Sequence, residues 1–170
     1  MPECDSITIF TDGACDPNPG PGGWAVILRS GVREKRVSGG YRKTTNNRME
    51  LRAVIEGLRA LNRPGLLVRV ICDSQYVTEA VTQGWLEKWA ARGFKKSDGL
   101  RENADLWIEL RALLRRHSVT FQWIRGHTGH RENEICDGLA VKARSVANLS
   151  ADIGFENPSA AFVSSGVTLL

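Results

Sequence analysis

The stretch LLVRVICD, residues 66–73, decides the fold class of this chain. It is almost continuously apolar, which is typical of a parallel strand that is buried on both faces. The strand ends at an acidic residue, Asp73, and Ser74 to Gln83 then has the pattern of a short helix capped by Asp73 or Ser74. The stretch therefore indicates a parallel strand followed by a helix.

Three further strands and a helix are expected before this stretch. The pattern of SITIFTD (6–12) predicts a strand that ends at an Asp-Gly turn, and that of GGWAVILR (22–29) predicts a second strand. VREKRVSGG (32–40) is predicted to be a third strand with one solvent-exposed face. TTNNRMELRAVIEGLRAL (44–61) carries apolar residues at helical spacing, and Pro64-Gly65 ends it. The first three strands are expected to form an antiparallel meander.

The segments that follow alternate helix and strand. A basic, aromatic insert (85–101) precedes a helical pattern (103–116), a last strand (119–124), a Gly/His-rich loop (126–131) and a final helix (133–147). This order predicts an α/β fold with a five-stranded mixed sheet, three strands antiparallel and two further strands parallel, flanked by helices on both faces. We expect one domain over 1–147. The tail, 148–170, contains no Lys or Arg and is either a partly disordered end or a loosely packed flap.

Composition limits the function. The chain has 170 residues, 42% hydrophobic and 25% charged, with a net charge of +4 that permits a polyanionic partner without requiring one. No apolar run approaches the roughly 20 residues of a membrane span, and the start does not resemble a signal peptide. A cytoplasmic protein is expected, and its four cysteines are expected to be reduced thiols.

Four carboxylates are candidates for chemistry, and each has a structural alternative. Asp12 could belong only to an Asp-Gly turn, Asp73 could be only an N-cap, Glu50 could complete a capping box begun by Asn47, and Asp137 could be a solvated helix residue. However, Glu50 lies beside the apolar stripe of its helix, where a carboxylate needs a partner or a metal. If the strands ending at Asp12 and Asp73 are parallel neighbours, their carboxylates converge.

Carboxylates gathered at one point repel one another, by roughly 4 kcal/mol for a pair at 4 Å and an effective dielectric near 20. Proteins accept that repulsion mainly where divalent cations neutralise it. Hard oxygen ligands suit Mg²⁺ or Mn²⁺, and two such ions serve phosphodiester hydrolysis. Zinc held by Cys136, His127 and His130 is an alternative whose spacing matches no common zinc site.

Four motifs together resemble one family. TDGACDPNPGPGG (11–23), TTNNRMEL (44–51), DSQYV (73–77) and GHTGHRENEICDGLA (126–140) are similar to the motifs of type-one ribonuclease H, in the same order, from about Ile7 to Ala147. The resemblance implies a ribonuclease H-like fold. It also implies an endonuclease that hydrolyses the RNA strand of RNA–DNA hybrids with two Mg²⁺ ions, or Mn²⁺ as a substitute, leaving 3′-hydroxyl and 5′-phosphate ends.

The same resemblance implies roles for single residues. Asp12, Glu50, Asp73 and Asp137 match the metal-binding catalytic carboxylates, and His127 matches a histidine that assists by proton transfer or product release. The expected hybrid contacts in the minor groove are Asn18, Asn47 and Gln75, with Cys15 acting through its backbone. Thr45 and Asn103, with Arg48, match a pocket that grips a DNA-strand phosphate.

The insert resembles the basic protrusion that clamps the hybrid in relatives. Its expected contacts are Trp85, Lys88, Trp89, Arg92, Lys95 and Lys96. The alternative is an amphipathic helix with the tryptophans in the core, and both interpretations can hold together. Phe94 stands where relatives often carry tryptophan, and Cys72 where threonine is frequent.

Three rival functions remain open at this stage. They are another nuclease of the wider superfamily, such as a transposase, integrase or junction resolvase; a module that binds hybrid or double-stranded RNA without cutting; and a structural protein. The family implies a monomer, and the sequence does not identify a replication-protein partner.

Overall fold

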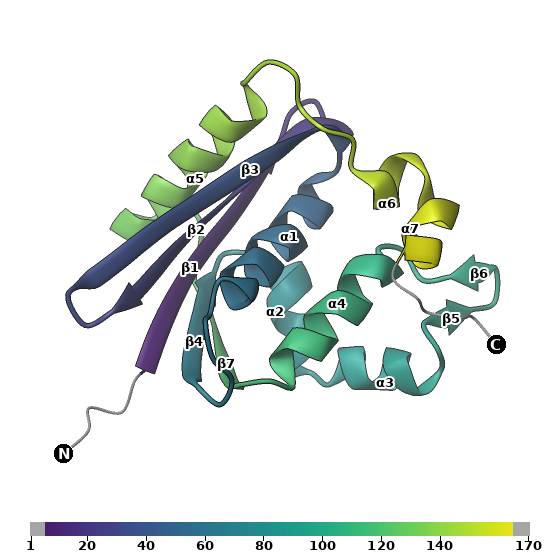
Figure 1. Cartoon of the computed structure of the whole chain (residues 1–170), viewed down its shortest axis with the longest axis horizontal. Coiled ribbons are helices and arrows are strands. Elements are labelled where there is room, and N and C mark those ends of the chain that lie inside the picture. The colour runs from purple at the N-terminus through teal and green to yellow at the C-terminus, as the bar shows by residue number, and fades with distance from the viewer. Residues whose placement is uncertain (1–5, 165–170) are drawn as a thin grey trace.

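A five-stranded sheet forms the centre of the molecule. The computed structural model describes residues 6–164, and the strands are β1 (Ser6–Cys15), β2 (Gly20–Ser30), β3 (Arg33–Thr44), β4 (Leu67–Cys72) and β7 (Ser118–Trp123). They lie in the order β3-β2-β1-β4-β7 (Figure 1). The pairs β1–β2 and β2–β3 are antiparallel, whereas β1–β4 and β4–β7 are parallel. The predicted mixed sheet is confirmed.

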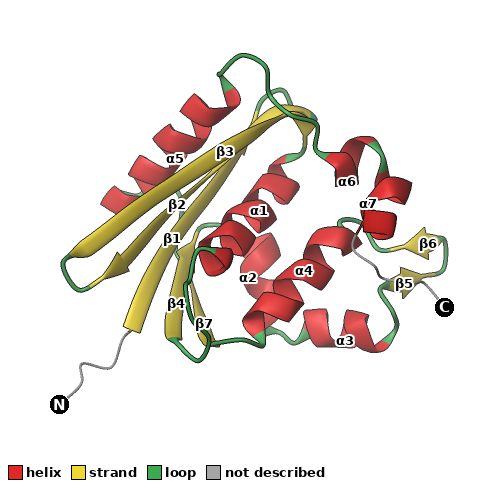
Figure 2. Cartoon of the chain, viewed as in Figure 1, coloured by secondary structure: helices red, strands yellow, loops and turns green. Residues whose placement is uncertain are grey.

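Helices cover both faces of the sheet (Figure 2). One face carries α1 (Asn46–Arg59), α2 (Gln75–Thr82), α3 (Trp85–Ala91) and α4 (Ala104–Leu114), and the other carries α5 (Arg131–Arg144). The remaining elements are a small hairpin of β5 (Lys95–Lys96) and β6 (Gly99–Leu100), and the short helices α6 (Ile153–Glu156) and α7 (Pro158–Ser164). No helix within residues 6–164 has the length and apolar character of a membrane span.

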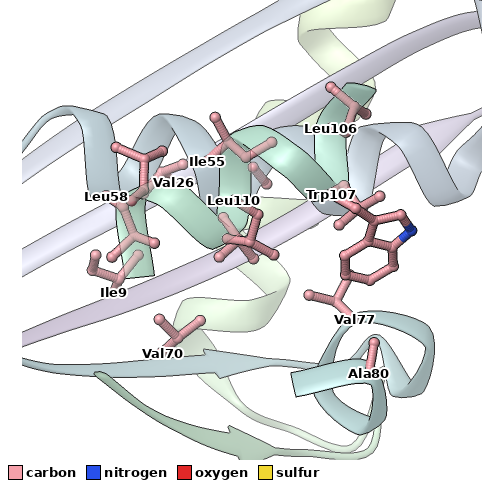
Figure 3. Close-up of a cluster of buried hydrophobic side chains, with 14 of the residues drawn as sticks. Ile9, Val26, Ile55, Leu58, Val70, Val77, Ala80, Leu106, Trp107 and Leu110 are labelled. Atoms are coloured by element: carbon pink, nitrogen blue, oxygen red, sulfur yellow. The ribbon is translucent and has the colours of Figure 1, made fainter. Parts of the chain in front are cut away.

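The main core lies between the sheet and the first group of helices. In Figure 3, Ile9, Val26 and Val70 from the strands face Ile55 and Leu58 of α1 and Leu110 of α4. A smaller core under α5 contains Ala25, Ile27, Cys136 and Ala140. These two layers fix α1 and α5 on opposite faces of β1, and both helices carry residues of the site described below.

The prediction that β4 is buried on both faces is wrong. Val68, Val70 and Cys72 are buried, but the alternate residues Leu67 and Arg69 are exposed. The reason is that α5 packs over β1, β2 and β3 and leaves the outer face of β4 uncovered. The strand is nevertheless parallel, because its register follows β1 from Ser6↔Leu67 to Thr11↔Cys72.

One local prediction also differs from the structure. The first strand does not end at an Asp-Gly turn, because Asp12 and Gly13 pair with Ala25 and Trp24 of β2 and β1 continues to Cys15. The predicted insert consists of α3 followed by the β5–β6 hairpin. Cys4, one of the four cysteines, lies outside the described residues, and the other three carry free thiols as expected.

Candidate active site

Three carboxylates meet at the edge of the sheet where parallel strands end. Oxygen atoms of Asp12, Glu50 and Asp73 all lie within 4.8 Å of one another. Asp12 and Asp73 follow directly after the paired residues Thr11 and Cys72 on neighbouring parallel strands, so their side chains leave the sheet side by side. This is the convergence that the sequence predicts from strand order.

A glycine brings the third carboxylate close. A Cβ atom on Gly13 would lie 2.5 Å from the backbone nitrogen of Glu50 and 2.6 Å from the backbone carbon of Met49. Only glycine allows β1 and the first turns of α1 to approach so closely. The close approach places Glu50, which is 6% exposed, beside Asp12.

Capping does not account for these carboxylates. Thr45 caps α1, accepting a hydrogen bond from the backbone N–H of Arg48, so Asn47 and Glu50 form no capping box. Ser74 caps α2 through its hydroxyl, which accepts from the N–H of Val77 at 3.2 Å. Glu50 Oε2 is buried without a hydrogen-bond partner. A buried carboxylate oxygen without a donor fits a site that receives a cation.

Electrostatics supports the same interpretation. Burial, and next the negative charge of Asp73, raises the pKa of Asp12 to about 8. Burial, and next the charge of Asp12, raises the pKa of Glu50 well above its ordinary value. Both shifts show that the clustered negative charges are costly in the folded chain, and a bound divalent cation would remove that cost.

The donor set fits a hard divalent cation. All three clustered groups are carboxylates, which suit Mg²⁺ or Mn²⁺. The zinc alternative is not assembled in the structure: Cys136 is fully buried and its thiol donates to the carbonyl of Phe10, whereas His127 and His130 are exposed in the loop before α5.

The triad forms the floor of an open pocket of about 290 Å³. Asp137 of α5 and His127 line its wall, which brings the fourth expected carboxylate and the expected histidine to the same place. Asp137 raises the pKa of Asp12, although it lies outside the tight triad. The pocket is also lined by Gly13, Ala14, Cys15, Asn46, Val141 and Arg144. Of these, Asn46 and Arg144 were not expected from the sequence.

The expected minor-groove residues lie around this edge of the sheet. Asn18 accepts a hydrogen bond from the N–H of Asn46 at 3.2 Å, which ties the loop after β1 to the start of α1. Asn47 and Gln75 are exposed in the first turns of α1 and α2. The Cys15 thiol contacts the carbonyl oxygens of Pro17, Gly20 and Thr44, so that its side chain is engaged by the loop.

Arg48, the third residue expected at the phosphate pocket, is buried. It is 2% exposed, and its guanidinium donates to both carboxylate oxygens of Asp105 and of Asp152 at 2.7–2.9 Å. Its positive charge is therefore balanced by two carboxylates inside the protein. It also donates to Asn103 Oδ1 at 3.3 Å, and its side chain lines the same cavity as Thr45 and Asn103.

Thr45 and Asn103, the other two expected phosphate contacts, line a cavity of about 330 Å³. Asn103 has a positive φ of 59°, and its amide nitrogen donates to the hydroxyl of Tyr76 at 3.0 Å. Because an amide nitrogen carries two N–H groups, a second one is left for a ligand. The hydrogen bond from Arg48 to Asn103 helps to hold the shape of this cavity.

The tail contributes to this cavity. Asp152 is 3% exposed and accepts from Thr44 Oγ1 at 2.6 Å as well as from Arg48. Gly154 and Phe155 of α6 line the same cavity as Asn103. Figure 1 shows α6 beyond the ends of α1 and α4. Residues 148–164 are thus docked through a buried ion pair instead of forming a loose flap, and the structure says nothing of 165–170.

The protrusion combines both predicted interpretations. Trp89 is half-buried between Trp107, at 5.2 Å between ring centroids, and the guanidinium of Arg101, at 4.2 Å. Phe94 is buried, so it is not available for stacking on a substrate. Among the expected hybrid contacts of this segment, those left exposed are Trp85, Lys88, Arg92, Lys95 and Lys96.

Comparison with known proteins assigns the chain to a family. Residues 4–145 match the family model described as RNase H. The ribonuclease H of Nitratidesulfovibrio vulgaris strain DP4 is 52% identical over 150 residues, covering 88% of this chain and 96% of the relative. That of Trichodesmium erythraeum is 49% identical over 151 residues, covering 88% and 96%. LC9-RNase H1, a type 1 RNase H with the type 2 active-site motif, superposes with a TM-score of 0.76 at 32% identity, covering 85% of this chain and 74% of that one.

The mixed sheet and its acidic pocket define the class of protein, and the chain belongs to the ribonuclease H family. Within that family it is a type 1 enzyme, a hydrolase of phosphodiester bonds. A further structure, LC11-RNase H1 in complex with RNA/DNA hybrid, shares the fold with a TM-score of 0.57 at 21% identity, covering 81% of this chain and 95% of that one.

Proposed function

We propose that this enzyme cuts the RNA strand of RNA–DNA hybrids endonucleolytically, with two Mg²⁺ ions, and leaves 3′-hydroxyl and 5′-phosphate ends. The observation that carries the proposal is the cluster of Asp12, Glu50 and Asp73, within 4.8 Å, with an unpartnered buried oxygen on Glu50. When bound, the ions would activate water and stabilise the leaving oxygen of the phosphodiester.

The four carboxylates would divide the work by their places in the fold. Asp12 and Glu50 are buried, whereas Asp73 and Asp137 are half-buried. The buried pair would hold the ions, and the half-buried pair would complete their coordination where the scissile phosphate enters. Mn²⁺, with the same oxygen ligands, is expected to substitute for Mg²⁺.

His127 is proposed to move a proton at the same pocket. It is exposed and has a positive φ of 55°, in a loop between Gly126 and Gly129. An imidazole at the pocket wall can accept and donate a proton through its ring nitrogens and can move with its loop. The step that it serves is proton transfer to the leaving group or departure of the product.

Selection of a hybrid is proposed to come from two separate places. Asn18, Asn47 and Gln75, with the backbone at Cys15, would contact the minor groove, in which RNA displays its 2′-hydroxyls. Thr45 and Asn103 would hold a phosphate of the DNA strand, and the exposed cations of the protrusion would hold the duplex from outside. A binding module without turnover would have no use for the carboxylate cluster.

The metal assignment is tested by Asp73→Asn, compared with Glu134→Gln as a matched acid-to-amide control on an exposed position of α5. Because Ser74 caps α2 and Trp123 bonds only the backbone carbonyl of Asp73, the substitution should leave the fold intact. We expect loss of hybrid cleavage by at least about 1000-fold with binding largely kept. Normal cleavage by Asp73→Asn would refute the assignment.

Two further expectations are kept as proposals, a monomeric state and a cytoplasmic location. Sedimentation of the purified enzyme and fractionation of cells that express it would test them.

A further inference from the structure

One basic side chain lines the acidic pocket. Arg144, in the last turn of α5, shares the pocket with Asp12, Glu50, Asp73 and Asp137. No expected role in metal binding, proton transfer or substrate contact uses it. A guanidinium at the margin of a pocket that receives a phosphodiester is a candidate phosphate ligand.

The helix places this arginine along the groove from the carboxylates. Asp137, Val141 and Arg144 all line the pocket and are separated by four and then three residues, so that they form one face of α5. The rise of a helix puts the backbone of Arg144 about 10 Å beyond that of Asp137. Arg144 therefore lines the pocket further along α5 than Asp137 does.

The helix packs at backbone distance from the sheet at this point. A Cβ atom on Gly23 of β2 would lie 2.9 Å from the backbone nitrogen of Arg144 and would overlap the carbonyl of Ala140. Glycine at this position lets α5 pack against β2 at backbone distance. The base of the Arg144 side chain is thus fixed, and only its outer part is free to adjust.

The present partner of Arg144 is weak. Its guanidinium lies 3.8 Å from Asp16 Oδ2, and the Asp16 side chain is 76% exposed against 22% for the arginine. Exposed pairs at such distances contribute little to stability. A phosphate could displace Asp16 from the guanidinium at low cost, with two parallel hydrogen bonds in place of one long contact.

We propose that Arg144 binds a phosphate of the RNA strand near the cleaved bond, on the side towards which α5 runs from Asp137. The inference rests on the proposed function, because it takes the strand at Asp137 to be the RNA. It assigns Arg144 to substrate binding and not to the chemical step.

The test is binding and cleavage of a hybrid at several salt concentrations by the full-length enzyme and Arg144→Ala. For Arg144→Ala we expect hybrid binding in Ca²⁺ buffer to be about 3- to 10-fold weaker, measured as a higher Kd. The KM for cleavage should rise and kcat should stay unchanged. The slope of log Kd against log salt should fall by about one. Lys142→Ala is the control: it removes the same charge two residues away, from the opposite side of the same helix turn.

Two further experiments distinguish phosphate binding by Arg144 from a purely structural role. If Arg144 only anchors the loop at Asp16, then Asp16→Asn should weaken binding equally; on our proposal Asp16→Asn leaves binding unchanged or tighter, and Arg144→Lys restores the salt slope. In a series of hybrids with one methylphosphonate at successive RNA positions near the cleaved bond, one position should weaken hybrid binding by the wild type but not by Arg144→Ala. Equal salt slopes for Arg144→Ala and Lys142→Ala, in a protein that still cuts hybrid, would overturn the inference alone, whereas an inactive wild type would overturn the proposed function.

Discussion

The buried ion cluster around Arg48 gives the most informative stability prediction. Asp152→Asn keeps the size of the side chain but removes one of the two negative charges that face a guanidinium with 2% exposure. Two hydrogen bonds from Arg48, at 2.7 and 2.9 Å, then lose their charge assistance. Removal of a partner from a buried pair costs about 3 to 5 kcal/mol, and Asp105 still offsets part of the charge. We therefore expect a loss of about 2 to 4 kcal/mol in the free energy of unfolding.

Urea denaturation of Asp152→Asn beside Glu156→Gln is the assay. The control removes a charge from the same tail segment, where Glu156 accepts two hydrogen bonds at 3.1 Å from Arg42, whose side chain is 62% exposed. An exposed pair should contribute less than about 1 kcal/mol. Similar losses for both variants would refute the reasoning that burial makes the Arg48 cluster strong.

The effect of Asp152 should also depend on pH. Burial alone raises the pKa of Asp152, but the hydrogen bonds and charge of Arg48, with the hydroxyl of Thr44, outweigh it and hold this pKa below its ordinary value. A carboxylate with a lowered pKa in the folded chain stabilises it fully above the ordinary value of about 3.9, and this stabilisation is lost as the pH falls through the lowered value. The difference between wild type and Asp152→Asn should be constant above about pH 5 and shrink below pH 4. A difference that does not change with pH would contradict the charge account.

Three other perturbations have defined outcomes. Asp12→Asn should raise the free energy of unfolding in EDTA at pH 8 by about 1 to 3 kcal/mol. The reason is that the pKa of Asp12 is raised to about 8, so that its charge destabilises the metal-free fold as pH rises from about 4. Urea titrations at pH 4 and pH 8 measure this gain in stability, and an equal gain at both pH values would count against the prediction. Gly126→Ala should lower kcat at least about 10-fold with little loss of stability, since the added Cβ would lie 2.6 Å from Asp73 Oδ2 and turn the Asp73 side chain away. Steady-state kinetics would measure kcat and thermal melts the stability. An unchanged kcat would contradict the prediction. The Lys95→Ala, Lys96→Ala double variant should reduce the salt slope of hybrid binding by about two, measured by fluorescence anisotropy, and an unchanged slope would mean that the protrusion does not reach the duplex.

The parts of the fold that depend on local pattern could be predicted. Strand order and the placement of Asp12 and Asp73 follow from a parallel strand beside β1, and the helical stripe places Glu50 next to the core. The turn expected at Gly13 was wrong because the residue meets a different requirement, the close approach of α1. A glycine that permits contact and a glycine that permits a turn look the same in one sequence.

The parts that depend on contacts distant in sequence could not be predicted. Arg48 meets Asp152 across 104 residues, and neither residue carries a local signal of burial, since arginine and aspartate are usually exposed. No local pattern therefore indicated that an ion pair joins α1 to the tail. Arg144 was missed for a similar reason: only the packing of α5 on β2 shows that its face is the one that lines the pocket.

The most direct test of the central claim uses four end-labelled duplexes: RNA–DNA, RNA–RNA, DNA–DNA, and DNA with a single ribonucleotide. Each is incubated with the purified enzyme in Mg²⁺, in Mn²⁺ and in EDTA. The carboxylate site and the family predict cutting of the RNA in the hybrid with either metal, none in EDTA, and at most weak cutting at the single ribonucleotide. Tight binding of the hybrid without cutting in either metal, or cutting that survives EDTA, would contradict the account.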